Sequence, residues 1–145
     1  LVVLNAAPWQ ELPESWWGLV DGWIFNEVEA EGCFGPDGIP LGYTGHPLLE
    51  HAFWVIVTRG DQGVEVYTKG GCFGLKAHRV EAVDTVGAGD SFVGALVYQL
   101  AQGTNLKQAA QFANAAAGLC CTYRGALPSL PTLEQVEAFR QQVAA

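Results

Sequence analysis

Three short apolar runs in the first sixty residues predict strands of a parallel sheet. They cover residues 1–4, 22–25 and 53–58, and each is almost continuous in apolar side chains. A strand that helices cover on both faces has this pattern, whereas a strand with one face in water alternates apolar and polar residues. We therefore expect a sheet with both faces buried.

The later part of the chain predicts a hairpin and then helices. Residues 64–67 and 72–77 flank a Lys-Gly-Gly turn and predict antiparallel strands. Apolar residues then recur at helical spacing over residues 92–100, 106–121 and 132–143. Together these elements predict an α/β fold, in which a mostly parallel sheet with a small antiparallel hairpin is flanked by helices.

A glycine-rich turn over residues 84–90, Asp-Thr-Val-Gly-Ala-Gly-Asp, joins these two parts. It follows an alternating apolar run that ends at Val83 and precedes a helix expected to begin near Ser91. Gly87 and Gly89 carry no Cβ, so the backbone there can turn tightly and approach a ligand closely. The first amides of the helix lack intrahelical partners and carry the positive end of its dipole. The turn is therefore a candidate phosphate site.

Two carboxylates, Asp84 and Asp90, flank this turn six positions apart. An anion site that also holds a carboxylate suggests phosphoryl transfer to a hydroxyl group, with Asp90 accepting the proton. An inert junction between a strand and a helix capped by Asp has the same local chemistry and stays an alternative. Phe92 excludes the dinucleotide fingerprint G-x-G-x-x-G starting at Gly87, and with it a nicotinamide-binding module, and the chain contains no Walker phosphate loop.

Composition restricts the class of protein. The chain has 145 residues, about one domain, and its 7 Lys and Arg against 15 Asp and Glu argue against a nucleic-acid partner. The sequence shows no membrane span and no signal peptide, so we expect a soluble cytoplasmic protein. Four cysteines without C-x-x-C spacing are expected to be reduced thiols: Cys33, Cys72, Cys120 and Cys121.

The stretch D-T-V-G-A-G-D-S-F over residues 84–92 resembles the signature of the ribokinase, or PfkB-type carbohydrate kinase, family. Four further stretches resemble motifs of this family in the same order: N-E-V-E-A-E (26–31), T-R-G-D-Q-G (58–63), A-N-A-A-A (113–117) and R-G-A-L-P-S (124–129). The resemblance implies a ribokinase-like fold and an ATP-dependent sugar kinase, most similar to those that convert D-ribose to ribose 5-phosphate. One alternative is a kinase of the same fold that phosphorylates another sugar or a nucleoside. A second alternative is a noncatalytic nucleotide-binding fragment.

The resemblance also implies roles for individual residues. Asp90 is the catalytic base, and the backbone at Gly87, Ala88, Gly89 and Asp90 forms the anion hole. ATP and Mg²⁺ involve residues outside this turn. Asn26 contacts the phosphates, Glu29 organises Mg²⁺ through water, and Asn114 faces the adenine. The nucleotide loop consists of Thr58, Arg59, Gly60, Asp61, Gln62 and Gly63. From the residues alone, Arg59 is equally well a surface side chain, and Asn114 a buried side chain that ties two helices together.

A monovalent cation is the third implied ligand. In the family, a carboxylate, a carbonyl and groups of a late loop hold it, which points to Asp84, Val86, Cys120, Tyr123, Gly125 and Ser129. Oxygen donors with a single carboxylate suit a weakly hydrated cation such as K⁺.

Members of this family are longer and carry their sugar-binding motifs and lid in the first half. None of those motifs is found here, so the resemblance implies that residues 1–145 are the C-terminal nucleotide-binding half, with the N-terminal half of the fold absent. The chain alone is then expected to be inactive. The complete protein is expected to bind ATP and a small sugar and to form a homodimer.

Overall fold

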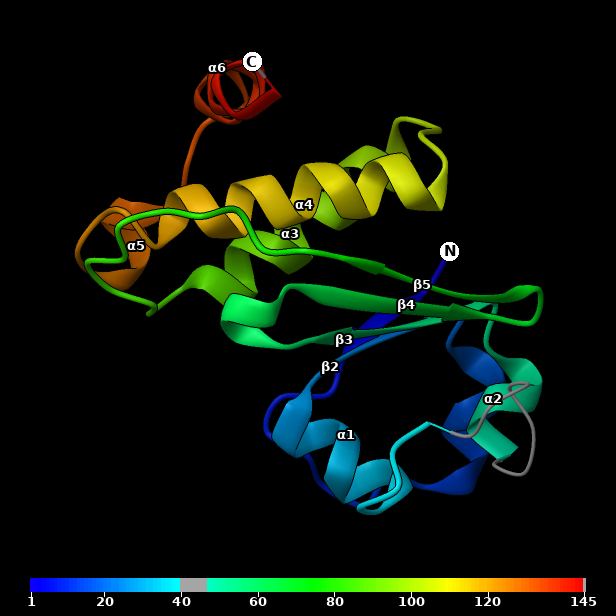
Figure 1. Ribbon diagram of the computed structural model, residues 1–145. Coiled ribbons are helices and arrows are strands. Elements are labelled where there is room, and N and C mark those ends of the chain that lie inside the picture. Colours follow the sequence, from blue (N-terminus) through cyan, green and yellow to red (C-terminus); the bar gives the residue numbers. More distant parts are fainter. Residues whose placement is uncertain (40–46, 145) are drawn as a thin grey trace. The chain divides into compact units, whose positions relative to one another are not determined.

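A computed structural model of the chain describes residues 1–39 and 47–144 (Figure 1). The chain forms two compact units, Leu1–Gly74 and Leu75–Ala145. The first unit contains a five-stranded sheet with short helices, and the second unit is mainly helical. Both kinds of element lie where the apolar pattern predicts them.

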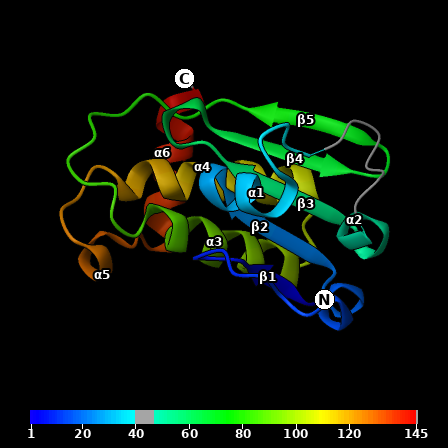
Figure 2. The same cartoon turned by 90° about the horizontal axis from the view of Figure 1, so that it is seen from below.

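The strands of the sheet follow one another in space as they do in the sequence (Figure 2). β1 (Val3–Asn5), β2 (Gly22–Asn26) and β3 (Trp54–Thr58) are parallel. β4 (Val64–Thr68) runs antiparallel to β3, and β5 (Gly71–Leu75) completes the hairpin at the far edge. The α/β fold with parallel strands and a small antiparallel hairpin is therefore confirmed.

The first predicted strand differs from its expectation. β1 begins at Val3 rather than at Leu1 and lies at an edge of the sheet, and Leu1 and Val2 are exposed. We expected helices to cover both faces of this run. A continuous apolar run does not show, however, whether the strand lies inside the sheet or at its edge. β2 and β3 are buried as predicted.

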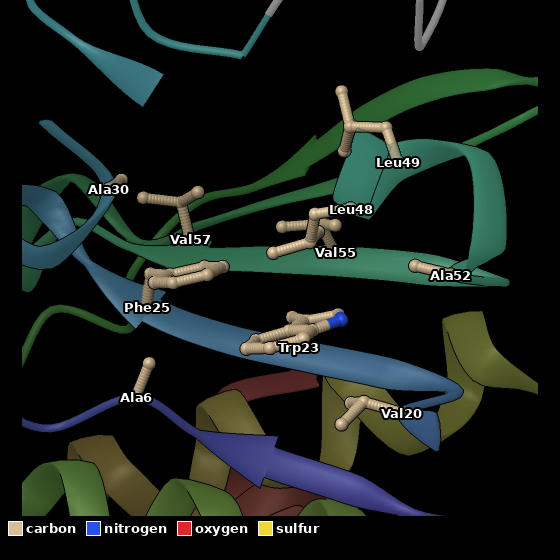
Figure 3. Close-up of a cluster of buried hydrophobic side chains, with 10 residues drawn as sticks. All are labelled: Ala6, Val20, Trp23, Phe25, Ala30, Leu48, Leu49, Ala52, Val55 and Val57. Atoms are coloured by element: carbon tan, nitrogen blue, oxygen red, sulfur yellow. The ribbon is translucent and has the colours of Figure 1, made fainter. Parts of the chain in front are cut away.

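The core of the first unit lies on one face of β2 and β3 (Figure 3). Trp23 and Phe25 alternate along β2, and Val55 and Val57 alternate along β3, so all four side chains point to the same face. Three short helices cover them: a 3₁₀ helix (Glu14–Leu19), α1 (Glu27–Phe34) and α2 (Pro47–His51). α1 ends at Phe34, and a stretch rich in glycine and proline follows it, of which residues 40–46 lie outside the described residues.

The second unit is built on two paired helices. α3 (Ala88–Ala101) packs on α4 (Leu106–Cys120), and α4 packs on α6 (Leu133–Ala144); a short helix, α5 (Ala126–Ser129), lies in the late loop. The alanine-rich side of α4 is buried, as its sequence predicts. The three long helices therefore match the predicted ones to within a few residues.

The alternating residues that end at Val83 do not form a strand. Residues 76–87 contain neither helix nor strand, and several of their hydrogen bonds join them to α4 and its C-cap residue Cys121. The amides of Val83 and Asp84 both donate to the carbonyl of Cys121, at 2.8 and 3.2 Å. The Nδ2 atom of Asn114 donates to the carbonyl of Lys76 at 2.8 Å. The backbone groups of this segment therefore find their hydrogen-bond partners at the end of a helix and on a side chain. In a sheet, a neighbouring strand would supply these partners.

His78 in this segment is expected to make the stability of the second unit depend on pH. Its ring lies 5.4 Å from the ring of Phe139, and burial, followed by the charge of Arg140, lowers its pKa below 6.5. The fold therefore favours the neutral imidazole, and this part of the stability is present above the unfolded pKa and is lost as the pH falls below it. We expect urea midpoints at pH about 7.5 and about 5.5 to differ more for the wild type than for His78→Gln. Equal differences would contradict this role.

Candidate active site

The glycine-rich turn leads directly into α3, which begins earlier than the sequence predicted. Ala88, rather than Ser91, is its first residue, Gly87 is the N-cap, and Asp90 lies inside the first turn instead of capping the helix. The amide of Ser91 donates to the carbonyl of Gly87 at 2.8 Å, the first bond of the helix. The amides of Gly89 and Asp90 precede this bond and lie outside the intrahelical ladder. The start of α3 thus offers main-chain donors beside a carboxylate.

The two glycines of the turn have different structural environments. Gly87 has φ +85°, and a Cβ there would lie 3.2 Å from the carbonyl oxygen of Ala126, so the fold itself requires glycine. At Gly89 a Cβ would meet no described atom within 4 Å. The packing of the described chain does not explain Gly89, whereas close approach of a ligand to the backbone would.

The carboxylate of Asp84 ties the turn to the late loop. Its Oδ1 accepts the amide of Val86 at 3.0 Å, and its Oδ2 accepts the amide of Gly125 at 2.9 Å. These bonds, the one from Gly125 first, lower the pKa of the Asp84 carboxyl below its usual value. Asp84 therefore stays ionised and fixes two segments that lie about forty positions apart in the sequence.

A buried polar cluster lies beside Asp84. The hydroxyl of Ser129 donates to the carbonyl of Ala126 at 2.7 Å and lies 3.5 Å from the carbonyl oxygen of Val86. The thiol of Cys120 lies 3.1 Å from the same hydroxyl. The amide of Tyr123 donates to the carbonyl of Cys120 at 3.2 Å, and its side chain is exposed. The structure thus gathers the residues that the resemblance linked to a monovalent cation.

In the first unit, Asn26 and Thr58 lie opposite each other at the carboxyl ends of β2 and β3. Asn26 is also the N-cap of α1: its Oδ1 accepts the amide of Glu29, and the Oε2 of Glu29 accepts the amide of Asn26, both at 2.8 Å. This capping box explains the positions of Asn26 and of the buried Glu29 by structure alone. Their contacts with phosphate and Mg²⁺ stay predictions.

The predicted nucleotide loop closes on itself after β3. The amide of Arg59 donates to the carbonyl of Gly63 at 2.8 Å, and residues Gly60–Gln62 form one turn of 3₁₀ helix. Gly60 and Gly63 both have positive φ, a backbone conformation that favours glycine. Asp61 and Gln62 are exposed at the tip of the loop.

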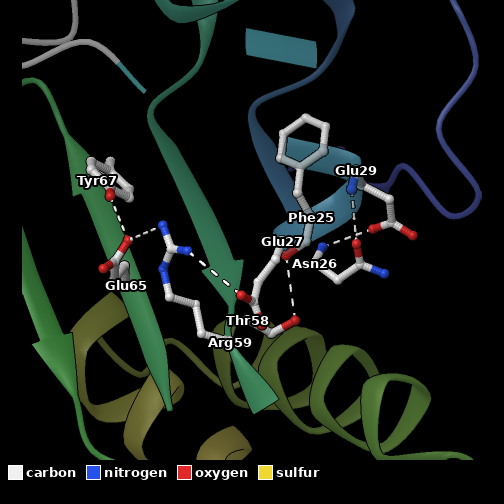
Figure 4. A network of polar contacts seen from close by, with 8 residues as sticks. All are labelled: Phe25, Asn26, Glu27, Glu29, Thr58, Arg59, Glu65 and Tyr67. Atoms are coloured by element: carbon white, nitrogen blue, oxygen red, sulfur yellow. Dashed lines mark hydrogen bonds and ion pairs between the residues drawn. The ribbon is translucent and has the colours of Figure 1, made fainter. Parts of the chain in front are cut away.

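Arg59 is not a plain surface side chain. Its Nη2 lies 2.9 Å from a carboxylate oxygen of Glu65, and its Nη1 lies 4.0 Å from Glu27 (Figure 4). The same oxygen of Glu65 accepts the hydroxyl of Tyr67 at 2.6 Å. Sequence reasoning missed this network, although Glu65 and Tyr67 are two positions apart on a predicted strand and must share a face.

Asn114 is buried on α4, and the structure gives it a partner in its own unit. Its amide nitrogen holds the carbonyl of Lys76, so it ties α4 to the segment before the turn rather than tying two helices together. Its contact with adenine stays a prediction.

The described residues contain no group of three His, Cys, Asp or Glu side chains that would hold a metal ion. Their helices include none that is both long and apolar enough to span a membrane. In the part of the chain that the structure describes, the four cysteines form no disulfide.

Comparisons with known proteins point in one direction. The family model described as pfkB family carbohydrate kinase matches residues 1–133. The ribokinase of Staphylococcus aureus is 36% identical over 139 residues, which are 92% of this chain and 46% of that protein. Fructokinase-1 of rice (Oryza sativa) is 35% identical over 127 residues, which are 83% of this chain and 39% of that protein.

Solved structures give the same result. The ribokinase of Thermotoga maritima superposes with a TM-score of 0.85 at 34% identity, over 97% of this chain and 49% of that chain. A putative ribokinase II of E. coli in complex with ATP and Mg²⁺ has a TM-score of 0.73 at 31% identity, over 89% of this chain and 42% of that chain. The chain thus spans about half the length of these relatives, or less. On this evidence of sequence and fold, the chain belongs to the pfkB family of carbohydrate kinases.

Proposed function

We propose that this chain forms the nucleotide-binding and catalytic half of an ATP-dependent sugar kinase. The observation that carries the proposal is the start of α3, where the amides of Gly89 and Asp90 and the carboxylate of Asp90 belong to one helical turn. Transfer of a phosphoryl group requires mainly positioning and charge stabilisation, and this turn offers donors for the phosphoryl oxygens together with a base. The E. coli ribokinase II that binds ATP and Mg²⁺ supports the choice of nucleotide.

In the proposed reaction, Asp90 orients the sugar hydroxyl and accepts its proton as the sugar oxygen bonds to the γ-phosphorus of ATP. The bond from that phosphorus to the bridging oxygen breaks, and ADP leaves with this oxygen. The main-chain amides of Gly89 and Asp90 hold the oxygens of the transferring group, whereas the amide of Ala88 already donates to the carbonyl of Thr85 at 3.2 Å. Each donor to the phosphoryl oxygens contributes a few kcal/mol to the transition state. The positive end of α3 stabilises the same negative charge. No covalent intermediate on the protein is needed.

Mg²⁺ and the nucleotide would engage the first unit as well. Mg²⁺, when bound, neutralises charge on the phosphates. Mg²⁺ keeps much of its water in protein sites, so it does not require three protein ligands. The described residues contain no group of three such side chains. Glu29 would hold it through water, and Asn26 would contact the phosphates. The loop from Thr58 to Gly63 would approach the ribose or phosphates through its glycines, and Asn114 would face the adenine.

D-Ribose is the proposed acceptor, phosphorylated at its 5-hydroxyl. Relatives of similar identity include ribokinases and fructokinases, so fructose is the second candidate. The test is a coupled assay of ADP formation by the complete kinase with each sugar at equal concentration. A higher kcat/KM for ribose is expected. A higher value for fructose would contradict the choice of ribose, and no turnover with any sugar or nucleoside would favour a noncatalytic fragment. Cytoplasmic location and homodimer formation stay predictions of the family resemblance.

We further propose that the Asp84 cluster binds K⁺. The carboxylate of Asp84, the carbonyl of Val86 and the hydroxyl of Ser129 are oxygen donors in one small region, together with groups at Cys120, Tyr123 and Gly125. This donor set fits a weakly hydrated monovalent cation better than Mg²⁺, which demands a tighter octahedron.

Asp84→Asn is expected to abolish most of the stimulation of the complete kinase by K⁺, because it removes the charge of the proposed site. An amide also cannot replace both acceptor oxygens that hold Val86 and Gly125. The measurement compares kcat in K⁺ and in Na⁺ for this variant and for Asp37→Asn, an exposed control. An unchanged response to K⁺ in Asp84→Asn would refute the role of Asp84.

A further inference from the structure

The network around Arg59 has no part in the chemistry described above. Arg59, Glu65 and Tyr67 are each half-buried, and their charged and polar ends meet at one carboxylate oxygen of Glu65 (Figure 4). Burial, and next the bond to Glu65, raise the pKa of Tyr67 to about 12, so its hydroxyl stays a donor. The Glu65 carboxylate is thus held from two sides.

This network joins the predicted nucleotide loop to two neighbouring elements, the hairpin strand β4 and the start of α1 beside Asn26. Arg59 is the first residue after β3, and its main chain accepts from Gln62 and donates to Gly63, which closes the loop. Glu65 lies on β4 opposite Val57 of β3. Glu27 is the first residue of α1 and follows Asn26. One guanidinium group therefore connects the loop, the hairpin and the start of α1.

The charge around Arg59 argues against direct phosphate binding. Its guanidinium lies 2.9 Å from one carboxylate and 4.0 Å from a second one, so its positive charge is already balanced. A phosphate that approached Arg59 would also approach the negative charge of Glu65. The hydrogen bonds of the network give the side chain a different task, which is to hold the loop in place.

We propose that Arg59 is a positioning residue: through its pair with Glu65 it fixes the loop of residues 59–63 against β4, and it does not itself bind phosphate. This inference deepens the proposed function and rests on it, since the loop matters to catalysis only if it binds the nucleotide. It separates Arg59 from the residues of the loop that would touch ATP.

Glu65→Gln distinguishes positioning from phosphate binding by the sign of its effect. If Arg59 positions the loop, the loss of the ion pair weakens binding of a nonhydrolysable ATP analogue by about threefold to fivefold. If Arg59 binds phosphate and Glu65 competes for it, the same change frees the guanidinium and strengthens binding. Calorimetric titration of the 145-residue chain in Mg²⁺ measures the dissociation constant, with Glu11→Gln as an exposed control in the same unit.

A double-mutant cycle tests whether the pair acts as one unit. Arg59→Gln is expected to weaken binding by a similar factor, and the double variant Arg59→Gln with Glu65→Gln is expected to lose nothing more. Additive losses would mean that Arg59 also contacts the nucleotide. Unchanged or stronger binding in Glu65→Gln would overturn the positioning role.

Amide hydrogen exchange tests the same idea without a nucleotide. The amides of Gln62 and Gly63, which bond to Arg59 and Gly60, should exchange faster in Glu65→Gln than in the wild type, while those of β2 should not change. Unchanged exchange in the loop would overturn the inference whether or not ATP binds. If Glu65→Gln showed the faster exchange but the wild-type chain bound no analogue, the positioning role would stand and the proposed function would be refuted.

Discussion

Asp90→Asn in the complete kinase is expected to lower kcat by about 100-fold to 10,000-fold, the range typical of a lost general base. Binding of ATP should hardly change, because the amides of Gly89 and Asp90, which we propose as phosphate donors, belong to the main chain and are retained. Asparagine has nearly the shape of aspartate but cannot accept the proton of the sugar hydroxyl. Steady-state kinetics give kcat, and calorimetry gives the dissociation constant of the nucleotide.

Glu134→Gln is the matched control for this experiment. Glu134 also lies in the first turn of a helix, α6, and is exposed, so its neutralisation removes the same charge from a comparable position. It should leave kcat unchanged. If Asp90→Asn weakened nucleotide binding and kept normal turnover, Asp90 would be a binding residue and not the base.

The second large effect concerns Gly89. Gly89→Ala is expected to weaken binding of the ATP analogue by tenfold or more, about 1.4 kcal/mol or more, because a methyl group would stand where a phosphate oxygen approaches the backbone. The fold should not suffer, since no described atom lies within 4 Å of the new Cβ. Alanine is also the better helix former, so stability should stay equal or rise by up to about 1 kcal/mol.

Gly94→Ala separates a ligand effect from a backbone effect. Gly94 is exposed on the same helix, α3, and a Cβ there also meets no described atom within 4 Å. Thermal unfolding should therefore report similar stability for both variants, and only Gly89→Ala should lose affinity. Equal affinity of the two variants would mean that no ligand approaches Gly89, and the anion site would have to lie elsewhere.

Strong apolar patterns explain why most of the fold could be predicted from the sequence. β2, β3 and α4 carry long uninterrupted or periodic apolar sets, and each was predicted to within about two residues of its bounds. The pattern failed where tertiary partners decide the structure. Residues before Asp84 alternate like a strand but bond to the end of α4, and the glycines of the turn hid the true start of α3.

Some residues of the candidate site could likewise be predicted from the local sequence, and others could not. Glycines and acids near a helix start mark the turn and Asp90 by local chemistry alone. The cluster around Asp84 depends on contacts with Gly125 and Ser129, which no short spacing reveals, so only the family resemblance pointed to it. The Arg59 network escaped both routes, because its bonds join a loop, a strand and a helix start.

Titration of the 145-residue chain with a nonhydrolysable ATP analogue and Mg²⁺ tests the central claim most directly. The chain holds the glycine-rich turn, the loop after β3 and the Asp84 cluster, so we predict saturable binding to one site that is tighter in K⁺ than in Na⁺. Circular dichroism and cooperative thermal unfolding establish that the sample is folded. No detectable binding by a folded chain would contradict the claim that this sequence carries the nucleotide site.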